Sequence, residues 1–181
     1  MTATNTQTTQ ISTLTLSSPD GAPINMSDFA GRPVVLQMVR YFGCLPCQAY
    51  LHELEANAER FARFEAQLIA VAGSADYQAR WLRDNGIKTT MLLDPDQLLR
   101  KAVGLGKLKV INLASPKGAL NYAKSFGRGR RPMRITHDTI QSPGAAILDA
   151  NLNKIWSYEG KILGDYPPID DIVAAANRLL S

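Results

Sequence analysis

The sequence of 181 residues is poor in cysteine, with only two, and both lie in the segment Cys44-Leu45-Pro46-Cys47. A disulfide across so short a loop would restrain little of the unfolded chain, so this pair is no stabilising framework. With 45% hydrophobic and 20% charged residues, the composition is that of a globular protein able to bury a core without such bridges. The pair therefore needs a chemical explanation.

The N-terminal segment lacks both a basic start and an apolar run, because Met1 to Gln10 is rich in Thr, Asn and Gln. It resembles neither a secretory signal nor a membrane anchor, and we expect residues 1–10 to form a disordered tail. Residues 11–181 are predicted to form one domain, since no repeat or second domain is visible. The expected compartment is the reducing cytoplasm, without membrane association. There a Cys-x-x-Cys is more often redox-active or metal-binding than structural.

Histidine is scarce as well, with only His52 and His137, and neither lies at zinc-finger spacing from the cysteines. A structural zinc site needs four ligands, so the sequence predicts no metal site.

Acidic residues are absent from residues 107–134, which contain eight of the 20 Lys and Arg residues of the chain. Those eight are Lys107, Lys109, Lys117, Lys124, Arg128, Arg130, Arg131 and Arg134. Such a run is typical of a solvated face and can also bind an anionic partner. Few aromatic residues accompany it, which disfavours nucleic-acid binding. We interpret residues 104–141 as a basic insertion.

The remaining sequence predicts an α/β fold with a central mixed sheet flanked by helices. A nearly continuous apolar run at 33–40 indicates a central strand that is covered on both faces. The predicted order begins with an N-terminal β-hairpin within 11–24. Strands at 33–40, 67–72 and 89–93 then alternate with helices at 45–63, 75–84 and 96–103. After the insertion come antiparallel strands at 145–148 and 154–158 and a helix at 169–180. Strand-helix-strand units imply right-handed parallel crossovers. This order is thioredoxin-like, with an N-terminal extension.

The central strand delivers Gly43 and Cys44 to its carboxyl end, where open α/β sheets place their sites. Cys44 is predicted at the N-terminus of the next helix, whose unpaired N–H groups favour a thiolate. Arg40 adds a cationic neighbour. One helical turn later Cys47 can close a short disulfide, with Pro46 stiffening the turn. We therefore expect Cys44 to attack a substrate and Cys47 to resolve the intermediate.

Two alternatives remain open at these positions. The cysteines could be small buried hydrophobic residues, as free cysteines often are. Pro143 is a candidate supporting residue, because a cis bond before it would expose a backbone edge beside the cysteines. It could equally be a proline at the entry of a strand.

Several segments together resemble the alkyl hydroperoxide reductase and thiol-specific antioxidant (AhpC/TSA) family, in particular its peroxiredoxin-like branch, which includes selenoprotein U-like proteins. The matching segments are Ser18-Pro19-Asp20-Gly21, Leu36 to Cys47, Leu93-Asp94-Pro95-Asp96, Gln141 to Asp149, and Gly164-Asp165-Tyr166-Pro167-Pro168. Only the Cys-x-x-Cys segment is specific by itself, but the ordered set spans nearly the whole chain beyond the tail.

The resemblance implies a thioredoxin-like fold and a redox-active cysteine pair. It implies electrons from a thiol reductant, such as a thioredoxin-type protein or a low-molecular-weight thiol, and no bound cofactor. Typical peroxiredoxins carry Pro-x-x-x-Thr-x-x-Cys, whereas here those positions hold Gln37 and Tyr41 ahead of Cys44, or Arg40 and Cys44 ahead of Cys47.

We therefore expect a thiol-disulfide oxidoreductase that reduces disulfides and, more slowly, hydroperoxides, as a monomer or a homodimer. The alternative is a non-catalytic binding module whose basic insertion recognises an anionic partner.

Overall fold

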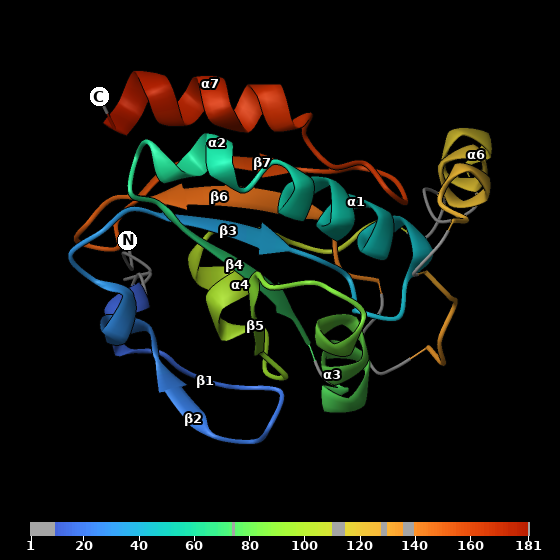
Figure 1. The fold of residues 1–181 in the computed structure, drawn as a ribbon, viewed down its shortest axis with the longest axis horizontal. Helices are drawn as coiled ribbons and strands as arrows, with labels where there is room; N and C mark the ends of the chain where they lie inside the picture. Colours follow the sequence, from blue (N-terminus) through green and yellow to red (C-terminus); the bar gives the residue numbers. More distant parts are fainter. Residues whose placement is uncertain (1–9, 74, 110–114, 128–129, 136–139, 181) are drawn as a thin grey trace, which may run out of the picture.

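A seven-stranded mixed β-sheet forms the centre of the computed structural model, which describes residues 10–73, 75–109, 115–127, 130–135 and 140–180 (Figure 1). The strands are β1 (Thr15–Ser17), β2 (Pro23–Asn25), β3 (Val34–Met38), β4 (Gln67–Ala72), β5 (Thr90–Leu93), β6 (Gly144–Leu148) and β7 (Lys154–Glu159). The helices are α1 (Leu45–Ala56), α2 (Glu59–Ala62), α3 (Asp76–Asp84), α4 (Leu98–Ala102), α6 (Pro116–Lys124) and α7 (Ile169–Leu180). The predicted tail lies outside the described residues except for Gln10.

The strands run in the order β2-β1-β5-β4-β3-β6-β7, and their directions follow from the connections. β3, β4 and β5 are mutually parallel because α1 and α3 serve as crossovers between them. β6 runs antiparallel to β3, and β7 antiparallel to β6. The predicted α/β class and thioredoxin-like order are confirmed. No helix in the described part of the chain combines the length and the apolar character that crossing a membrane requires.

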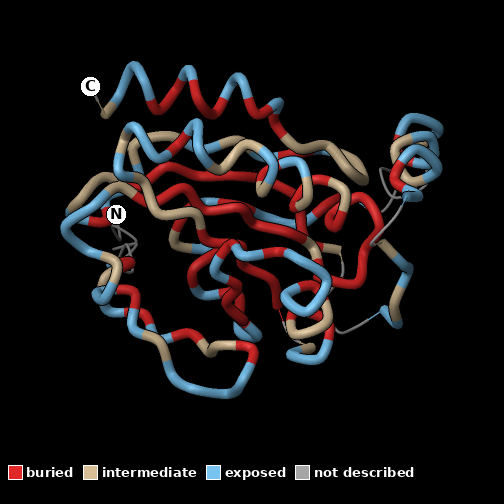
Figure 2. Tube along the Cα trace, viewed as in Figure 1, coloured by how far each residue is buried: buried red, intermediate tan, exposed pale blue. Residues whose placement is uncertain are grey.

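The central strand β3 is buried along its whole length, as its apolar run predicts (Figure 2). Alternate side chains point to opposite faces of the sheet. Val34, Leu36 and Met38 face a cluster that includes α4 and the N-terminal turns. Val35 faces the cluster formed by α1, α2 and α7, on the side where these helices lie in Figure 1. Both faces being covered, the carboxyl end of β3 is a rigid support for the residues that follow it.

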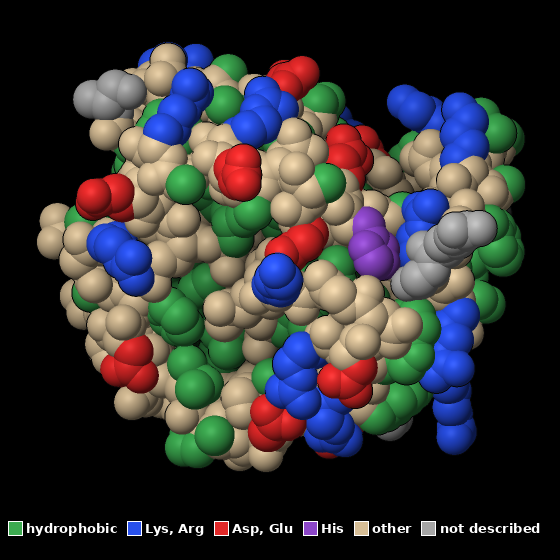
Figure 3. Space-filling view, viewed as in Figure 1, with side chains coloured by type: hydrophobic (Ala, Val, Ile, Leu, Met, Phe, Trp, Pro, Cys, Tyr) green, Lys and Arg blue, Asp and Glu red, His purple; other side chains and the backbone are tan. Residues whose placement is uncertain are grey.

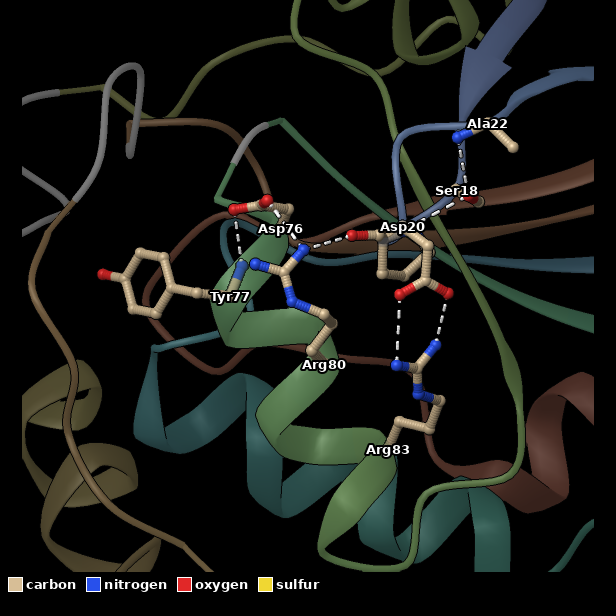
Figure 4. A network of polar contacts seen from close by, with 8 residues as sticks. Ser18, Asp20, Ala22, Asp76, Tyr77, Arg80 and Arg83 are labelled. Carbon is tan, nitrogen blue, oxygen red and sulfur yellow. Dashed lines mark hydrogen bonds and ion pairs between the residues drawn. The ribbon is translucent and has the colours of Figure 1, made fainter.

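The N-terminal hairpin is present, but β1 begins only at Thr15, and Ile11–Thr13 forms a 3-10 turn. β1 meets the rest of the sheet through the single pair Ser17 and Leu93. Two arginines of α3 reinforce this weak junction from outside (Figure 4). Arg83 donates to both carboxylate oxygens of Asp20, at 2.7 and 3.2 Å, and Arg80 donates to the carbonyl oxygen of Pro19 at 2.6 Å.

The helix predicted over 45–63 is interrupted, which corrects the sequence interpretation. α1 ends at Ala56, and the chain resumes a helical conformation at Glu59. At the junction, Asn57 adopts φ −110° and ψ 10°, and its side-chain amide donates to the carbonyl oxygen of Glu53 at 2.8 Å. An asparagine side chain competes in this way with the backbone hydrogen bonds of a helix, and the helix breaks there. The helical spacing of apolar residues nevertheless continues on both sides of the break.

The two ends of the basic insertion meet, since Lys107 and Gln141 form an antiparallel bridge. The amide of Leu108 donates to the carbonyl oxygen of Ile140 at 2.7 Å. Within the insertion, Ser115 caps α6 by accepting a hydrogen bond from the Gly118 amide at 3.0 Å. Figure 3 shows Lys and Arg side chains along the edge of the molecule where α6 and residues 130–135 lie. Residues 110–114, 128–129 and 136–139 of the insertion lie outside the described residues.

Candidate active site

Cys44 and Cys47 lie where the chain turns from β3 into α1. Cys44 occupies the N-cap of α1, with φ −80° and ψ 125°, and Cys47 follows in the first turn. Pro46 is accommodated in that turn, because the first amides of a helix need no partner within it. Each cysteine is only 1% exposed. The corner position agrees with the prediction from the sequence, and the burial of both cysteines matches the alternative in which they are small buried residues.

Each sulfur atom has a different polar neighbour. The guanidinium of Arg40 lies 3.7 Å from Cys44 Sγ. The hydroxyl of Tyr166 lies 3.1 Å from Cys47 Sγ. The two thiols are also hydrogen-bonded to each other, and the backbone amide of Arg40 donates to Cys47. Both cysteines are free, so the structure represents the reduced dithiol.

These contacts divide the acidity of the pair unequally. Burial opposes ionisation of Cys47, but the hydrogen bond from the Cys44 thiol, the charge of Arg40 and the hydroxyl of Tyr166 together lower its pKa to about 6. Because the Cys44 thiol donates its proton to Cys47 and is itself buried, the pKa of Cys44 is raised well above its ordinary value. As a coupled pair, the two thiols release one proton readily and the second with difficulty.

In the structure Cys47 is therefore the thiol with the lowered pKa, whereas from the sequence we expected the thiolate at Cys44. Cys44 sits at the N-cap, and the Cys47 backbone amide lowers its pKa, but the hydrogen bond that it gives to Cys47 and its burial outweigh this contribution. Cys47 gains instead from a hydroxyl that belongs to a segment more than one hundred residues away in the sequence. Helix position alone could not reveal that contact.

A buried arginine joins the strand ends beside the cysteines. Arg100 of α4 is 1% exposed and donates to the carbonyl oxygen of Val39 at 2.7 Å and to that of Ser142 at 2.6 Å. Val39 immediately precedes Arg40, and Ser142 immediately precedes Pro143. Arg100 thus fixes the end of β3 to the start of β6, and with them the two supporting residues that the sequence analysis named.

Pro143 lies buried at the entry of β6, where its carbonyl oxygen accepts a hydrogen bond from the Gly160 amide at 2.7 Å. The described residues contain no cis peptide bond, so the Ser142-Pro143 bond is trans. The interpretation of Pro143 as a strand-entry residue is therefore the one that matches the geometry.

Gly43 lies where two other segments approach the backbone closely. Its amide donates to Gln78 Oε1 at 2.8 Å, and its carbonyl oxygen accepts from the Met133 amide at 3.0 Å. A Cβ atom at this position would lie 2.7 Å from both Gln78 Nε2 and Met133 Cβ. The absence of a side chain therefore lets α3 and the insertion pack against the residue before Cys44.

Residues 130–135 of the insertion are hydrogen-bonded to the strand-to-helix corner by two buried glutamines. Gln48 of α1 donates to the carbonyl oxygen of Arg131 at 2.9 Å and accepts from its amide at 3.0 Å. Gln78 of α3 donates to the carbonyl oxygen of Arg134 at 2.9 Å. The Arg131 guanidinium lies 4.8 Å from the centre of the Trp81 ring. We call residues 130–135 the strap, since they are hydrogen-bonded to α1, to α3 and to Gly43, the residue before Cys44.

A small groove adjoins the site at Tyr166. It has a volume of ≈ 180 Å³ and lies between α1, α6 and residues 164–166, with Pro46, Glu53, Asn121 and Lys124 among its lining residues. The groove offers room for a small molecule beside the tyrosine that contacts Cys47. Among the described residues, no group of three or more His, Cys, Asp and Glu side chains is arranged to hold a metal ion.

Sequence reasoning missed Tyr166, Arg100, Gln48 and Gln78. Tyr166 occurred only within a segment of the family resemblance, and the glutamines occur on amphipathic helices where polar residues are ordinary. Gln48, Gln78 and Arg100 stand out only because the fold buries a polar side chain, which the sequence does not reveal.

A buried dithiol at the junction of a central strand and a helix, with one thiol of lowered pKa, defines a thiol-dependent oxidoreductase of the thioredoxin-like class. Residues 8–151 match the sequence profile described as the AhpC/TSA family, and the chain belongs to this family. The family assignment confirms the resemblance drawn from the sequence.

Solved structures of peroxiredoxins share the fold at low sequence identity. The bacterioferritin comigratory protein of Xanthomonas campestris has a TM-score of 0.66 and 15% identity, with 93% of this chain and 92% of that chain covered. For PrxQ of Xylella fastidiosa the TM-score is 0.64 and the identity 12%, with 96% and 93% covered. For peroxidoxin BcpB of Mycobacterium tuberculosis the values are 0.63 and 15%, with 93% and 94% covered. A search of curated protein sequences finds no match.

Proposed function

We propose that the Cys44 and Cys47 dithiol reduces small hydroperoxides, with Cys47 as the attacking sulfur and Cys44 as the resolving one. The observation that carries this proposal is the asymmetry of the buried pair, in which the Tyr166 hydroxyl lies 3.1 Å from Cys47 Sγ. The lowered pKa of Cys47 and the raised pKa of Cys44 agree with it. The solved structure of the Xanthomonas campestris protein is described in terms of alkyl peroxide reduction, which supports the same substrate class here.

The reaction balances with these two residues. The Cys47 thiolate attacks one oxygen of ROOH, the O–O bond breaks, and the leaving RO⁻ takes a proton to give an alcohol or water. Cys47 is then a sulfenic acid. The Cys44 thiol attacks its sulfur, the S–S bond forms and water leaves. A thiol reductant restores the dithiol through a mixed disulfide.

Small substrates are favoured because each cysteine is only 1% exposed. A hydroperoxide can reach Cys47 after a limited displacement near Tyr166, whereas a protein disulfide needs the strap to move away. We propose disulfides of low-molecular-weight thiols as the second substrate class, which the same dithiol reduces by exchange. This order reverses the one expected from the missing Pro-x-x-x-Thr pattern.

The proposed setting is the cytoplasm. The proposed electron donor is a thioredoxin-type protein or a low-molecular-weight thiol, and the proposed assembly is a monomer or a homodimer. Four further residues are proposed to support the dithiol. Arg40 acts through its charge and Gly43 through close packing. Pro46 shapes the helix turn, and Pro143 shapes the entry of the strand.

The test is thiol trapping with mass spectrometry after adding hydrogen peroxide, tert-butyl hydroperoxide or oxidised glutathione to the reduced protein. We expect wild type to form the 44–47 disulfide, Cys44→Ser to stop at a sulfenic acid on Cys47, and Cys47→Ser to show no peroxide-dependent oxidation of Cys44. A pair that forms no disulfide at any redox poise would overturn the proposal. A sulfenic acid on Cys44 in Cys47→Ser, at the wild-type rate, would reverse the assigned roles.

A further inference from the structure

Tyr166 is held rigidly in the segment between β7 and α7. Its ring stacks on Tyr50 of α1, with ring centroids 4.4 Å apart and planes inclined by 20°. The residues on both sides are also fixed. The carboxylate of Asp165 accepts a hydrogen bond from the Tyr158 hydroxyl at 2.8 Å, and the carbonyl oxygen of Pro167 accepts one from the Tyr50 hydroxyl at 2.6 Å. The position of the Tyr166 hydroxyl is therefore set by the fold.

That hydroxyl points at the sulfur of Cys47, 3.1 Å away. A thiolate can only accept, so the tyrosine must donate when Cys47 is ionised. Burial raises the pKa of Tyr166 well above its ordinary range, with the nearby cysteines adding to the effect. The hydroxyl consequently remains protonated, and available as a donor, at every pH at which the Cys47 thiolate works.

The two hydroxyls of the stacked pair have separate tasks. Tyr50 donates to a backbone carbonyl, which is a structural bond, whereas Tyr166 donates to one of the reacting sulfurs. On the other sulfur, Arg40 contacts Cys44 at 3.7 Å. The charge of Arg40 favours ionisation of both thiols, so the Tyr166 hydroxyl is the donor that distinguishes Cys47 from Cys44.

We propose that Tyr166 is a catalytic residue whose hydroxyl donates a hydrogen bond to Cys47 and thereby stabilises the thiolate that attacks the substrate. No bond to Tyr166 forms or breaks. This inference rests on the proposed function, because it assigns a role within attack by Cys47. A hydrogen bond to an ionised group is stronger and shorter than one between neutral groups, and its acceptor here, Cys47, is only 1% exposed.

The decisive experiment compares Tyr166→Phe with Tyr50→Phe in the full-length reduced protein. Both variants keep the aromatic ring and lose one hydroxyl, so they match in volume and differ in the acceptor that loses its donor, a sulfur for Tyr166 and a backbone carbonyl oxygen for Tyr50. The first readout is the pH profile of iodoacetamide alkylation, with Cys47 and Cys44 distinguished by mass spectrometry. The second is the single-turnover rate of 44–47 disulfide formation with hydrogen peroxide.

For Tyr166→Phe we expect the alkylation midpoint of Cys47 to move upward by about one to two pH units. Disulfide formation at pH 6 should slow severalfold, because the loss of thiolate outweighs the higher nucleophilicity of a more basic sulfur. At a pH above both midpoints the variant should equal or exceed wild type, because its thiolate is fully formed and more basic. Tyr50→Phe keeps the hydroxyl on Cys47 and loses only a bond to the neighbouring Pro167, so its midpoint should move much less than that of Tyr166→Phe, although its thermal stability falls.

An unchanged Cys47 midpoint in Tyr166→Phe would overturn the inference, and so would an equal shift in both variants, because that would trace the effect to packing. The proposed function fails in a different way, when wild type itself forms no 44–47 disulfide with peroxide or low-molecular-weight disulfide. The alkylation profiles need no turnover, so they test Tyr166 independently of that outcome.

Discussion

Replacing Arg100 by methionine tests the support beneath the dithiol most directly. The change keeps an unbranched stem and removes the guanidinium, which donates to the carbonyl oxygens of Val39 and Ser142 and, at 2.8 Å, to Gln97 Oε1. Val39 is fully buried and Ser142 is 2% exposed, so water cannot readily replace these donors.

The expected cost follows from those contacts. Hydrogen bonds from a charged group contribute about 1.5–3 kcal/mol each, and part of that sum is offset because the charge no longer has to be buried. We expect Arg100→Met to lower the free energy of unfolding by about 3–5 kcal/mol, the range typical for breaking a buried charged network.

Urea denaturation followed by circular dichroism measures this change. Lys101→Met is the matched control, because Lys101 is adjacent but exposed and its ammonium lies 3.2 Å from the carbonyl oxygen of Asp96. The control should lose less than about 0.5 kcal/mol. A loss below about 1 kcal/mol for Arg100→Met would refute the reasoning, since it would mean that the strand ends hold their positions without the guanidinium.

Two further predictions concern the closure of the site. Gly43→Ala places a Cβ atom 2.7 Å from Gln78 and Met133. Because this atom pushes the strap away, we expect a lower melting temperature and faster alkylation of the cysteines. An unchanged melting temperature would contradict this prediction. Gln48→Leu removes both hydrogen bonds to Arg131, so hydrogen exchange at the Arg131 backbone amide should become about tenfold faster or more. Exchange at the wild-type rate would show that the strap does not depend on Gln48.

Much of the fold could be predicted because its signals are local. The uninterrupted apolar run of β3 indicates a strand covered on both faces, and the alternation of strands and helices indicates parallel crossovers. The errors are local too. Asn57 breaks the predicted first helix because its amide bonds to the Glu53 carbonyl, although the apolar spacing continues to Phe61.

The position of the candidate site could be predicted from the sequence, but which of its two thiols is the more acidic could not. Cys44, Cys47, Arg40 and Pro46 are neighbours in sequence, so their meeting at one corner needs only a strand followed by a helix. The thiol–thiol hydrogen bond and Arg40 contribute most to the low pKa of Cys47, and the hydroxyl of Tyr166, from a distant segment, adds to them. No spacing rule relates Tyr166 to Cys47.

The two cysteines, placed at a strand-to-helix corner, and the order of strands and helices were enough to predict redox chemistry on an α/β fold. Local composition suffices for that, since hydrophobic period and helix position are properties of short segments. Only the tertiary structure places the Tyr166 hydroxyl on Cys47, buries both sulfurs, and holds part of the basic insertion against the strand-to-helix corner. Those properties depend on distances between residues far apart in the chain, and electrostatic and hydrogen-bond energies are set by such distances.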